Sequence, residues 1–286
     1  MTVERISVIG AGLMGHGIAQ VCAQAGYQVV MRDLSEELVN KGLERIRKFL
    51  SDGVHKGKVS QADADSTLGR ILATTSLEEA ARDTDLIIEA IVEDMEQKKQ
   101  LFRELDRLCA PHVIFASNTS YLSITEMAAV TGRPDRFIGM HWFNPPQLMR
   151  LIEIPRGQDT SEETVATIVE LAKRLGKVPA VCSDSPGFIV NRLLQPFYNE
   201  AMSLLEEGVA SAQDIDTALK AGGGFRMGPL ELRDFVGLDT ALRGTEVIYN
   251  ALRHDKFKPR QCLIRLVKAG HYGRKTGRGF YTYGQE

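Results

Sequence analysis

The sequence predicts an α/β fold in which a doubly wound parallel sheet comes first and an all-helical region follows. Two observations support this prediction. Short apolar strands alternate with helical patterns up to about residue 183, and helical periodicity alone continues from residue 184 to 286. The chain has 286 residues, of which 43% are hydrophobic and 25% charged, so it is long enough for two domains with separate cores. We therefore expect domains at 1–183 and 184–286.

The first elements are a strand, a glycine-rich turn, a helix and a second strand, all within residues 5–33. The apolar strand runs directly into Gly10-x-Gly12-x-x-Gly15, which contains Leu13 and Met14. In this context Gly10 permits the turn, Gly12 lets the backbone approach a pyrophosphate, and Gly15 allows the helix to pack closely on the strand. The N-terminus of the helix then faces the phosphate anions. The pattern favours a Rossmann-type dinucleotide site over an ordinary tight turn.

Asp33, at the end of the second strand, indicates which dinucleotide binds. A carboxylate there accepts the ribose hydroxyls of NAD and repels the 2′-phosphate of NADP. Arg32 beside it is the counter-evidence, because a guanidinium could attract that phosphate. An arginine that flanks a strand end is more often solvated, so we expect NAD, with NADP the less favoured alternative.

The alternation of strands and helices continues along the chain. Further strands are expected at 71–74, 85–91, 113–117, 137–140, 151–154 and 178–182, and helices at 35–50, 162–175, 186–207, 212–221 and 229–252. For the helix at 186–207, Asp184 and Ser185 are expected to cap the N-terminus, with Pro186 in the first turn. Ligands of such sheets bind beyond the carboxyl ends of the strands. Polar residues just past those ends are therefore candidate site residues: Glu93, Lys98, Asn118, Ser120 and His141.

His141 and Glu153 are candidates for acid–base chemistry. If their strands run antiparallel across the Asn144-Pro145-Pro146 turn, the imidazole and the carboxylate can meet. A carboxylate on one ring nitrogen fixes the tautomer and increases the basicity of the other nitrogen, which suits a general base. A purely structural histidine is the alternative.

Ser120 and Asn191 are polar groups of the kind that holds a substrate during hydride transfer. Each also has a plainer interpretation. Ser120 could cap a helix that begins near Ser123, and Asn191 could bridge backbone groups.

Composition and charge exclude several classes of protein. The net charge of −2 and the pI near 6.3 argue against a surface for nucleic acid or for an anionic membrane. The four cysteines lie far apart and no apolar run is long enough for a membrane span, so a cytoplasmic protein is expected. No metal site is predicted.

A series of motifs in order gives the chain a family resemblance. They are GAGLMG (10–15), IIEAIVED (87–94), ASNTS (116–120), HWFNP (141–145), DSPGFIVNRLL (184–194), MGPLEL (227–232), VGLD (236–239) and KTGRGFY (275–281). From end to end the chain resembles the L-3-hydroxyacyl-CoA dehydrogenases, most closely the short bacterial 3-hydroxybutyryl-CoA type. The resemblance implies reversible NAD-dependent oxidation of an L-3-hydroxyacyl-CoA, with 3-hydroxybutyryl-CoA the expected substrate.

The resemblance also implies roles for individual residues. His141 is the expected general base, Glu153 its orienting partner, and Ser120 and Asn191 the substrate-holding pair, with Asn191 reaching a cleft between the domains. The matching cofactor positions, beyond the glycine loop, are Asp33, Glu93, Lys98, Asn118, Ser120, Asn144 and Lys275. Lys56 matches a CoA-contacting position in the helical hairpin after residue 35, although a solvated basic turn explains it equally well. A homodimer formed through the C-terminal helices is also implied.

Departures from the family pattern concern specificity. Tyr121 stands where a small residue is usual and Trp142 where Phe is usual, and Arg226 is a further difference. If both aromatic rings line the acyl chain's path, they should favour a four-carbon substrate. Two other functions remain open at this stage: a dehydrogenase of free hydroxy or sugar acids, and a non-catalytic NAD-binding protein of the crystallin kind.

Overall fold

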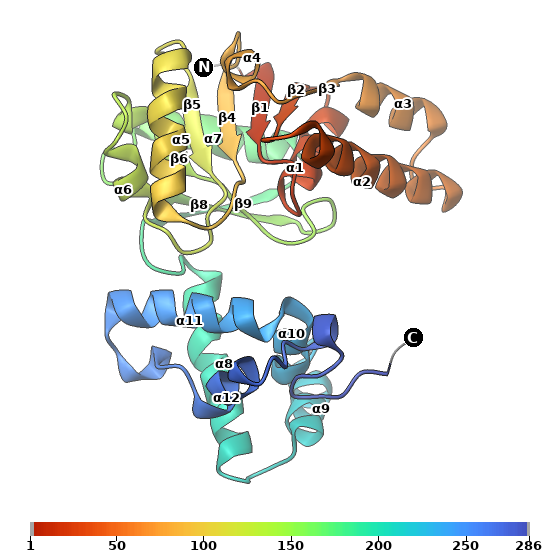
Figure 1. Cartoon of the computed structure of the whole chain (residues 1–286), viewed down its shortest axis with the longest axis vertical. Coiled ribbons are helices and arrows are strands. Elements are labelled where there is room, and N and C mark those ends of the chain that lie inside the picture. Colours follow the sequence, from red (N-terminus) through yellow and green to blue (C-terminus); the bar gives the residue numbers. More distant parts are fainter. Residues whose placement is uncertain (1–2, 285–286) are drawn as a thin grey trace. The chain divides into compact units, whose positions relative to one another are not determined.

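The computed structural model describes residues 3–284 and divides into two compact units, Met1–Ser185 and Pro186–Glu286 (Figure 1). The division falls two residues after the boundary expected between 183 and 184. None of the helices in the described residues is long and apolar enough to cross a lipid bilayer.

The N-terminal unit is built on one mixed sheet. Its strands are β1 (Arg5–Ile9), β2 (Gln28–Arg32), β3 (Ile71–Thr74), β4 (Leu86–Glu89), β5 (Ile114–Ser117), β6 (Phe137–Gly139), β7 (His141–Trp142), β8 (Leu151–Arg156) and β9 (Val178–Ser183). The order is β3-β2-β1-β4-β5-β6-β8-β7, with β9 paired to β8. Strands β1 to β6 are parallel in the order of a Rossmann-type doubly wound sheet, and β8 is antiparallel to both β6 and β7. The predicted fold class is confirmed.

Helices connect these strands, and most begin at a side-chain cap. They are α1 (Gly15–Gln24), α2 (Glu36–His55), α3 (Gln61–Gly69), α4 (Leu77–Ala81), α5 (Met95–Leu108), α6 (Ile124–Ala128), η1 (Pro134–Arg136) and α7 (Glu162–Arg174). A hydroxyl or carboxylate oxygen accepts a backbone N–H of the first turn at Ser35, Ser60, Ser76, Asp94, Ser123 and Ser161. Each bond satisfies a donor that the helix itself leaves unpaired.

The sheet buries both of its faces, because alternate residues of a strand point to opposite sides. In β5, Ile114 and Ala116 join a core cluster that includes residues of α1, α2 and α7. Phe115, between them, packs on the other side against Phe102 of α5 and Phe137 of β6, with ring centroids 5.7 and 6.3 Å away. A strand buried on both faces reads as a continuous apolar run, which explains why the sequence pattern identified these strands.

The C-terminal unit is helical. It contains α8 (Val190–Glu206), α9 (Ala212–Gly223), α10 (Pro229–Val236), α11 (Leu238–Leu252), η2 (Asp255–Phe257), α12 (Gln261–Lys268) and η3 (Arg274–Thr276). Its core is a cluster of apolar side chains drawn from α8, α9, α10, α11 and α12: Tyr198, Ala201, Met202, Ile215, Leu230, Leu238 and Leu263.

Two buried aspartates, Asp216 and Asp234, bind the segment 280–283 to the helices of this unit. Asp234 accepts the backbone N–H groups of Phe280 and Tyr281 at 3.0 and 2.9 Å and the hydroxyl of Tyr283 at 3.0 Å. Asp216 accepts the Tyr281 hydroxyl at 2.6 Å and two N–H groups at the start of α10. Both aspartates are about 1% exposed, so each carboxylate depends on these donors for its hydrogen bonds.

Two expectations about the helical unit were wrong. Helix α8 begins at Val190 rather than at Pro186, because Gly187 and Phe188 have φ of 76° and 49°, which are incompatible with a right-handed helix. Asp184 instead accepts the Ser123 hydroxyl and the Thr125 N–H, within the N-terminal unit. The predicted helix 229–252 is two helices, α10 and α11, because Gly237 between them has a φ of 100°.

The glycine-rich turn between β1 and α1 uses its glycines for different purposes. A Cβ atom on Gly15 would lie 1.7 Å from the carbonyl oxygen of Gly10, so α1 can approach β1 this closely only with glycine at that position. Gly10 has a φ of 106°, and a Cβ atom there would meet the Ala90 carbonyl at 2.5 Å. A Cβ atom on Gly12 would meet no protein atom within 4 Å.

These distances predict opposite outcomes for two alanine substitutions. Gly15→Ala should lower the free energy of unfolding by more than about 2 kcal/mol, because backbone must move to admit the methyl group. Gly12→Ala should stay within about 1 kcal/mol of the wild type. Thermal unfolding followed by circular dichroism measures both. Equal unfolding midpoints for the two variants would contradict the packing role of Gly15.

Candidate active site

The carboxyl ends of β1, β2 and β4 border a cavity of about 440 Å³, lined by Gly10, Gly12, Asp33 and Ala90 among others. Asp33 accepts the Ala11 N–H and the Leu34 N–H, each at 2.7 Å, so its carboxylate ties the glycine-rich turn to the end of β2. The residues fit a dinucleotide: a carboxylate at the ribose position, open space over Gly12, and a helix N-terminus beyond the turn.

Arg32 also lines this cavity, but its side chain forms a hydrogen bond with Thr75, which does not line it. Its Nε donates to the carbonyl of Thr75 at 3.1 Å. The guanidinium is therefore engaged with the backbone that follows β3. This contact weakens the case for Arg32 as a receptor of the 2′-phosphate of NADP.

The register of β7 and β8 brings His141 and Glu153 together. The two residues are direct partners in the antiparallel pair, and Nδ1 of His141 lies 2.8 Å from a carboxylate oxygen of Glu153. His141 is 4% exposed and Glu153 is fully buried. On the other side of the ring, Nε2 lies 3.0 Å from the Ser120 hydroxyl. A carboxylate, an imidazole and a hydroxyl therefore form one hydrogen-bonded line.

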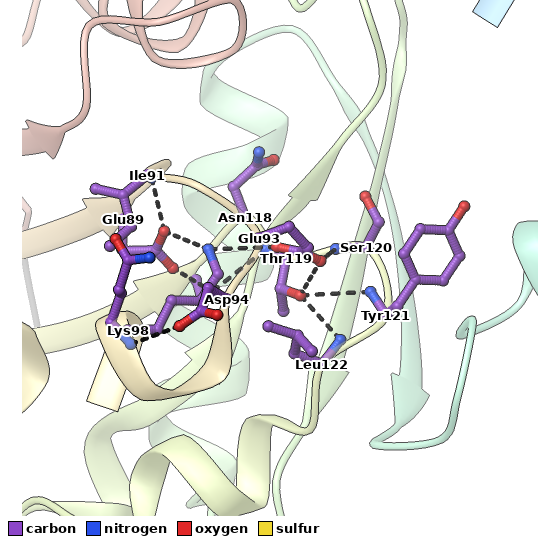
Figure 2. Close-up of polar contacts among 12 residues, drawn as sticks. Glu89, Ile91, Glu93, Asp94, Lys98, Asn118, Thr119, Ser120, Tyr121 and Leu122 are labelled. Atoms are coloured by element: carbon purple, nitrogen blue, oxygen red, sulfur yellow. Dashed lines mark hydrogen bonds and ion pairs between the residues drawn. The ribbon is translucent and has the colours of Figure 1, made fainter. Parts of the chain in front are cut away.

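Ser120 lies on the loop after β5, and this loop is held by Glu93 from the neighbouring strand connection (Figure 2). One oxygen of Glu93 accepts the Thr119 hydroxyl at 2.5 Å and the Ser120 N–H at 2.9 Å. The Thr119 oxygen in turn accepts the N–H groups of Tyr121 and Leu122. Ser120 therefore does not cap α6, whose N-cap is Ser123.

Behind Glu93 lies a buried ion pair between Glu89, the last residue of β4, and Lys98 of α5 (Figure 2). The Lys98 ammonium is 2.5 Å from Glu89 and 3.4 Å from Glu93, and its side chain is 1% exposed. Burial lowers the pKa of Lys98, but the charges of Glu89 and Glu93 raise it more, so the pKa lies above its usual value. Lys98 is therefore a buried, protonated cation.

Sequence reasoning did not identify Glu89 or Thr119 as site residues. Glu89 is fully buried and accepts the Ile91 N–H at 2.8 Å and the Ser117 hydroxyl at 2.6 Å, besides the Lys98 ammonium. The available signal was a glutamate inside the apolar run DLIIEAI, with a lysine nine residues later. A charge on a buried strand requires a partner, and α5 supplies it.

The remaining candidates in the N-terminal unit have separate positions. Asn118 accepts the Trp142 N–H at 2.9 Å and so links β5 to β7. Asn144 is exposed in the turn after β7, and Lys56 is the exposed C-terminal cap of α2. Leu13 is 62% exposed at the glycine-rich turn, and Met14 is the residue before α1.

Two candidates belong to the C-terminal unit. Asn191 lies half-buried in the first turn of α8. Lys275 lies in η3, with its ammonium 2.5 Å from Asp239. Their roles at the site remain predictions.

The aromatic residues beside the site differ from each other. Trp142 is 2% exposed and packs in the sheet core, with the Lys177 ammonium 5.7 Å from its ring centre. It therefore gives no support to the idea that its ring lines the path of an acyl chain. Tyr121 is half-buried on the loop beside Ser120. Among residues 3–284, no three His, Cys, Asp or Glu side chains cluster in a way that could hold a metal ion.

Comparison with known proteins agrees with this geometry. Residues 5–185 match the family model described as "3-hydroxyacyl-CoA dehydrogenase, NAD binding domain", and residues 187–283 match "3-hydroxyacyl-CoA dehydrogenase, C-terminal domain". A probable 3-hydroxybutyryl-CoA dehydrogenase of Bacillus subtilis is 48% identical over 283 residues, which cover 99% of this chain and 98% of the relative. The human mitochondrial hydroxyacyl-coenzyme A dehydrogenase is 44% identical, over 98% of this chain and 91% of the relative.

Solved structures show the same likeness. The crystal structure of (S)-3-hydroxybutyryl-CoA dehydrogenase from Ralstonia eutropha superposes with a TM-score of 0.96 at 45% identity, and covers 99% of this chain and 100% of the other. The family models account for both units, and the relatives match over nearly the whole chain. The chain therefore belongs to the 3-hydroxyacyl-CoA dehydrogenase family and is an NAD-binding oxidoreductase of that kind.

Proposed function

We propose that this enzyme oxidises (S)-3-hydroxybutyryl-CoA with NAD, reversibly, and that His141 is its general base. The observation on which the mechanism rests is the hydrogen-bonded line of Glu153, His141 and Ser120. The substrate is supported by relatives over nearly the full chain whose names specify 3-hydroxybutyryl-CoA, such as that of Bacillus subtilis.

The order of the three groups determines which ring nitrogen acts. A carboxylate only accepts hydrogen bonds, so the Nδ1 atom of His141 carries the proton that faces Glu153. The Nε2 atom is then an acceptor, and the Ser120 hydroxyl donates to it. A substrate hydroxyl that takes a place beside Ser120 meets the same basic nitrogen.

The chemical step follows from this arrangement. The glycine-rich turn and Asp33 would hold NAD, which would supply the acceptor for the hydride that leaves carbon 3 of the substrate. As the hydride leaves, Nε2 of His141 takes the proton of the 3-hydroxyl group, and the buried carboxylate of Glu153 stabilises the imidazolium that forms. In the reverse direction the imidazolium returns this proton to the oxygen of the 3-keto group.

Substrate and cofactor contacts are assigned by position. Ser120 holds the 3-oxygen, Asn191 is its second holder, and Lys56 contacts CoA. The cofactor positions are Gly10, Gly12, Leu13, Met14, Gly15, Asp33, Glu93, Lys98, Asn118, Ser120, Asn144 and Lys275. Support is strongest at Asp33 and the glycine-rich turn, which border the cavity or join its edge. Lys98 acts through Glu93 and does so indirectly, because its ammonium is buried between the carboxylates of Glu89 and Glu93.

A homodimer formed through the C-terminal helices is part of the proposal. Large apolar side chains on this unit are exposed, among them Leu193 at 70%, Phe235 at 53% and Val236 at 50%. A second copy of the chain would bury apolar surface of this kind.

Replacing His141 tests the base. His141→Gln should lower kcat by about 10²–10⁴-fold, because a general base contributes that much, while the Kd for NADH stays near the wild-type value. His112→Gln is a matched control, since His112 is 54% exposed on the surface. Steady-state kinetics with acetoacetyl-CoA and NADH measure the effect. A His141→Gln enzyme with near-normal kcat would end the assignment.

Replacing Asp33 tests the choice of cofactor. Asp33→Asn should narrow the preference for NADH over NADPH, because it removes the charge that repels the 2′-phosphate and keeps an oxygen to accept the Ala11 N–H. Asp33→Ala should also narrow the preference, but it loses that hydrogen bond. The ratio of kcat/KM values for the two cofactors is the measurement. A wild-type enzyme that strictly requires NADPH would show that Arg32 governs the site.

Substrate length and class are tested together. We expect kcat/KM for a four-carbon 3-ketoacyl-CoA to exceed that for six- or ten-carbon chains by about 10–200-fold, because Tyr121 adds bulk beside Ser120. Tyr121→Ser should reduce this preference. A profile that is flat or highest at ten carbons would refute the role of Tyr121.

The same assay tests the other two functions. A higher kcat/KM for free 3-keto acids than for their CoA esters would favour the free-acid dehydrogenase. No turnover at all would favour the crystallin-like protein.

A further inference from the structure

The mechanism above gives no role to Glu89, which forms a buried ion pair with Lys98. The pair is nevertheless connected to the loop of Ser120 by two routes, of which Figure 2 labels the residues of the first. One route runs from Lys98 to Glu93 and on to the Ser120 N–H. The other runs from Glu89 to the Ser117 hydroxyl, which accepts the Thr119 N–H at 3.2 Å. The pair is therefore linked through Glu93 and Ser117 to the loop that carries Ser120.

The ammonium of Lys98 is not shared evenly. It lies 2.5 Å from Glu89 and 3.4 Å from Glu93, so its contact with Glu89 is the closer one. Glu89 is fully buried, and it accepts hydrogen bonds from three donors, which suits a charged carboxylate. The Glu93 side chain is 29% exposed.

The charges of this group do not cancel. Two carboxylates face one ammonium, and Lys98 is held in its protonated form by both. Two ionised carboxylates leave one negative charge in excess, and Glu93, the carboxylate farther from the ammonium, is the less compensated of the two. That carboxylate binds the backbone of Ser120 and so lies beside the reacting groups.

We propose that Glu89 sets the charge of the nicotinamide site: by binding the Lys98 ammonium it leaves Glu93 negatively charged, which favours the cationic ring of NAD⁺ over the neutral ring of NADH. This inference rests on the proposed function, because it requires the nicotinamide ring to bind beside Ser120. Glu89 itself touches neither substrate nor cofactor, so it is a positioning residue that acts through Lys98.

Glu89→Gln tests the proposal with almost no change of shape. The amide can still accept the Ile91 N–H and can donate to the Ser117 hydroxyl, but it no longer neutralises Lys98. The ammonium then compensates Glu93. One unit charge at about 10 Å, with an effective dielectric constant of about 20, changes an equilibrium by roughly tenfold. The ratio of Kd for NADH to Kd for NAD⁺ should fall by about that factor.

The experiment measures binding, without substrate and without turnover. NADH affinity is obtained from its fluorescence and NAD⁺ affinity from titration calorimetry, with the full chain at one ionic strength. The double variant Glu89→Gln/Lys98→Met loses one charge of each sign and keeps Glu93 charged. Its ratio should return to within about threefold of the wild type, since the electrostatic effect depends on net charge.

A matched control separates charge from geometry. Ser117→Ala removes the hydrogen bond that the Ser117 hydroxyl donates to Glu89 and the one that it accepts from the Thr119 N–H, without changing any charge. This variant should weaken the binding of NAD⁺ and of NADH by the same factor, so the ratio of their Kd values should not change. If Ser117→Ala shifts the ratio as much as Glu89→Gln does, the effect is structural and the proposal is overturned.

The remaining outcomes are also decisive. If Glu89→Gln does not fold, Glu93→Gln can be tested in its place, because it also removes one negative charge from the group. This variant must also lower the ratio of Kd for NADH to Kd for NAD⁺. An unchanged ratio in a folded Glu89→Gln or Glu93→Gln variant overturns the charge-setting role and leaves the proposed function intact. A wild-type protein that binds neither NAD⁺ nor NADH overturns both.

Discussion

The carboxylate of Glu89 ends strand β4 in the fully buried interior, and a charge in that position must be matched inside the protein. The match determines what surrounds it. Lys98 must extend inward from α5, the Ser117 hydroxyl must turn toward β4, and the backbone at Ile91 must direct its N–H back to the strand end. The loops after β4 and β5 are thereby tied to one point. Those loops provide Glu93, which contacts Lys98, and Ser120, which is linked to the ion pair through Glu93.

A second constraint is the strand register that sets His141 opposite Glu153. Side chains of directly opposed residues in an antiparallel pair point to the same face, so this contact requires no loop to hold it. The carboxylate is buried and the imidazole nearly so, which leaves little room for another orientation of the ring. The proposed base and its partner are therefore part of the sheet, whereas the hydroxyl of Ser120 comes from a loop. In the proposed site, changes in the loop alone could alter which substrate is bound.

Much of this could be predicted from the sequence because local patterns reflected local physics. The alternation of buried strands with amphipathic helices, and the glycine-rich turn followed by Asp33, identified the doubly wound sheet and its cofactor edge. The proximity of His141 and Glu153 was expected on condition that their strands were antiparallel, and they are. The helices expected at 162–175 and 212–221 also lie within two residues of α7 and α9 as observed.

The failures have equally local causes. Asp184, Ser185 and Pro186 have the composition of a helix start, but the positive φ angles at Gly187 and Phe188 delay α8 to Val190. Helical periodicity continues through Gly237, so it could not reveal the break between α10 and α11. Trp142 was judged by its neighbour His141, although successive residues of a strand face opposite sides of a sheet. Glu89 was not predicted to be a site residue because it lies inside an apolar run. Its partner is Lys98 of α5, and the sequence pattern does not show that this lysine points into the core.

The hydrogen bonds that Asp234 and Asp216 accept from Phe280 and Tyr281 have a consequence for biosynthesis. A ribosome makes these aspartates long before their partners, since Asp234 precedes Phe280 by 46 residues and Asp216 precedes Tyr281 by 65. Until those partners emerge, Asp234 lacks the N–H groups of Phe280 and Tyr281, and Asp216 has the N–H groups of α10 but not the Tyr281 hydroxyl. The last strand of the N-terminal sheet ends at Ser183, well before these partners. During synthesis, these hydrogen bonds of the helical unit can therefore form only after residues 280–281 have been made.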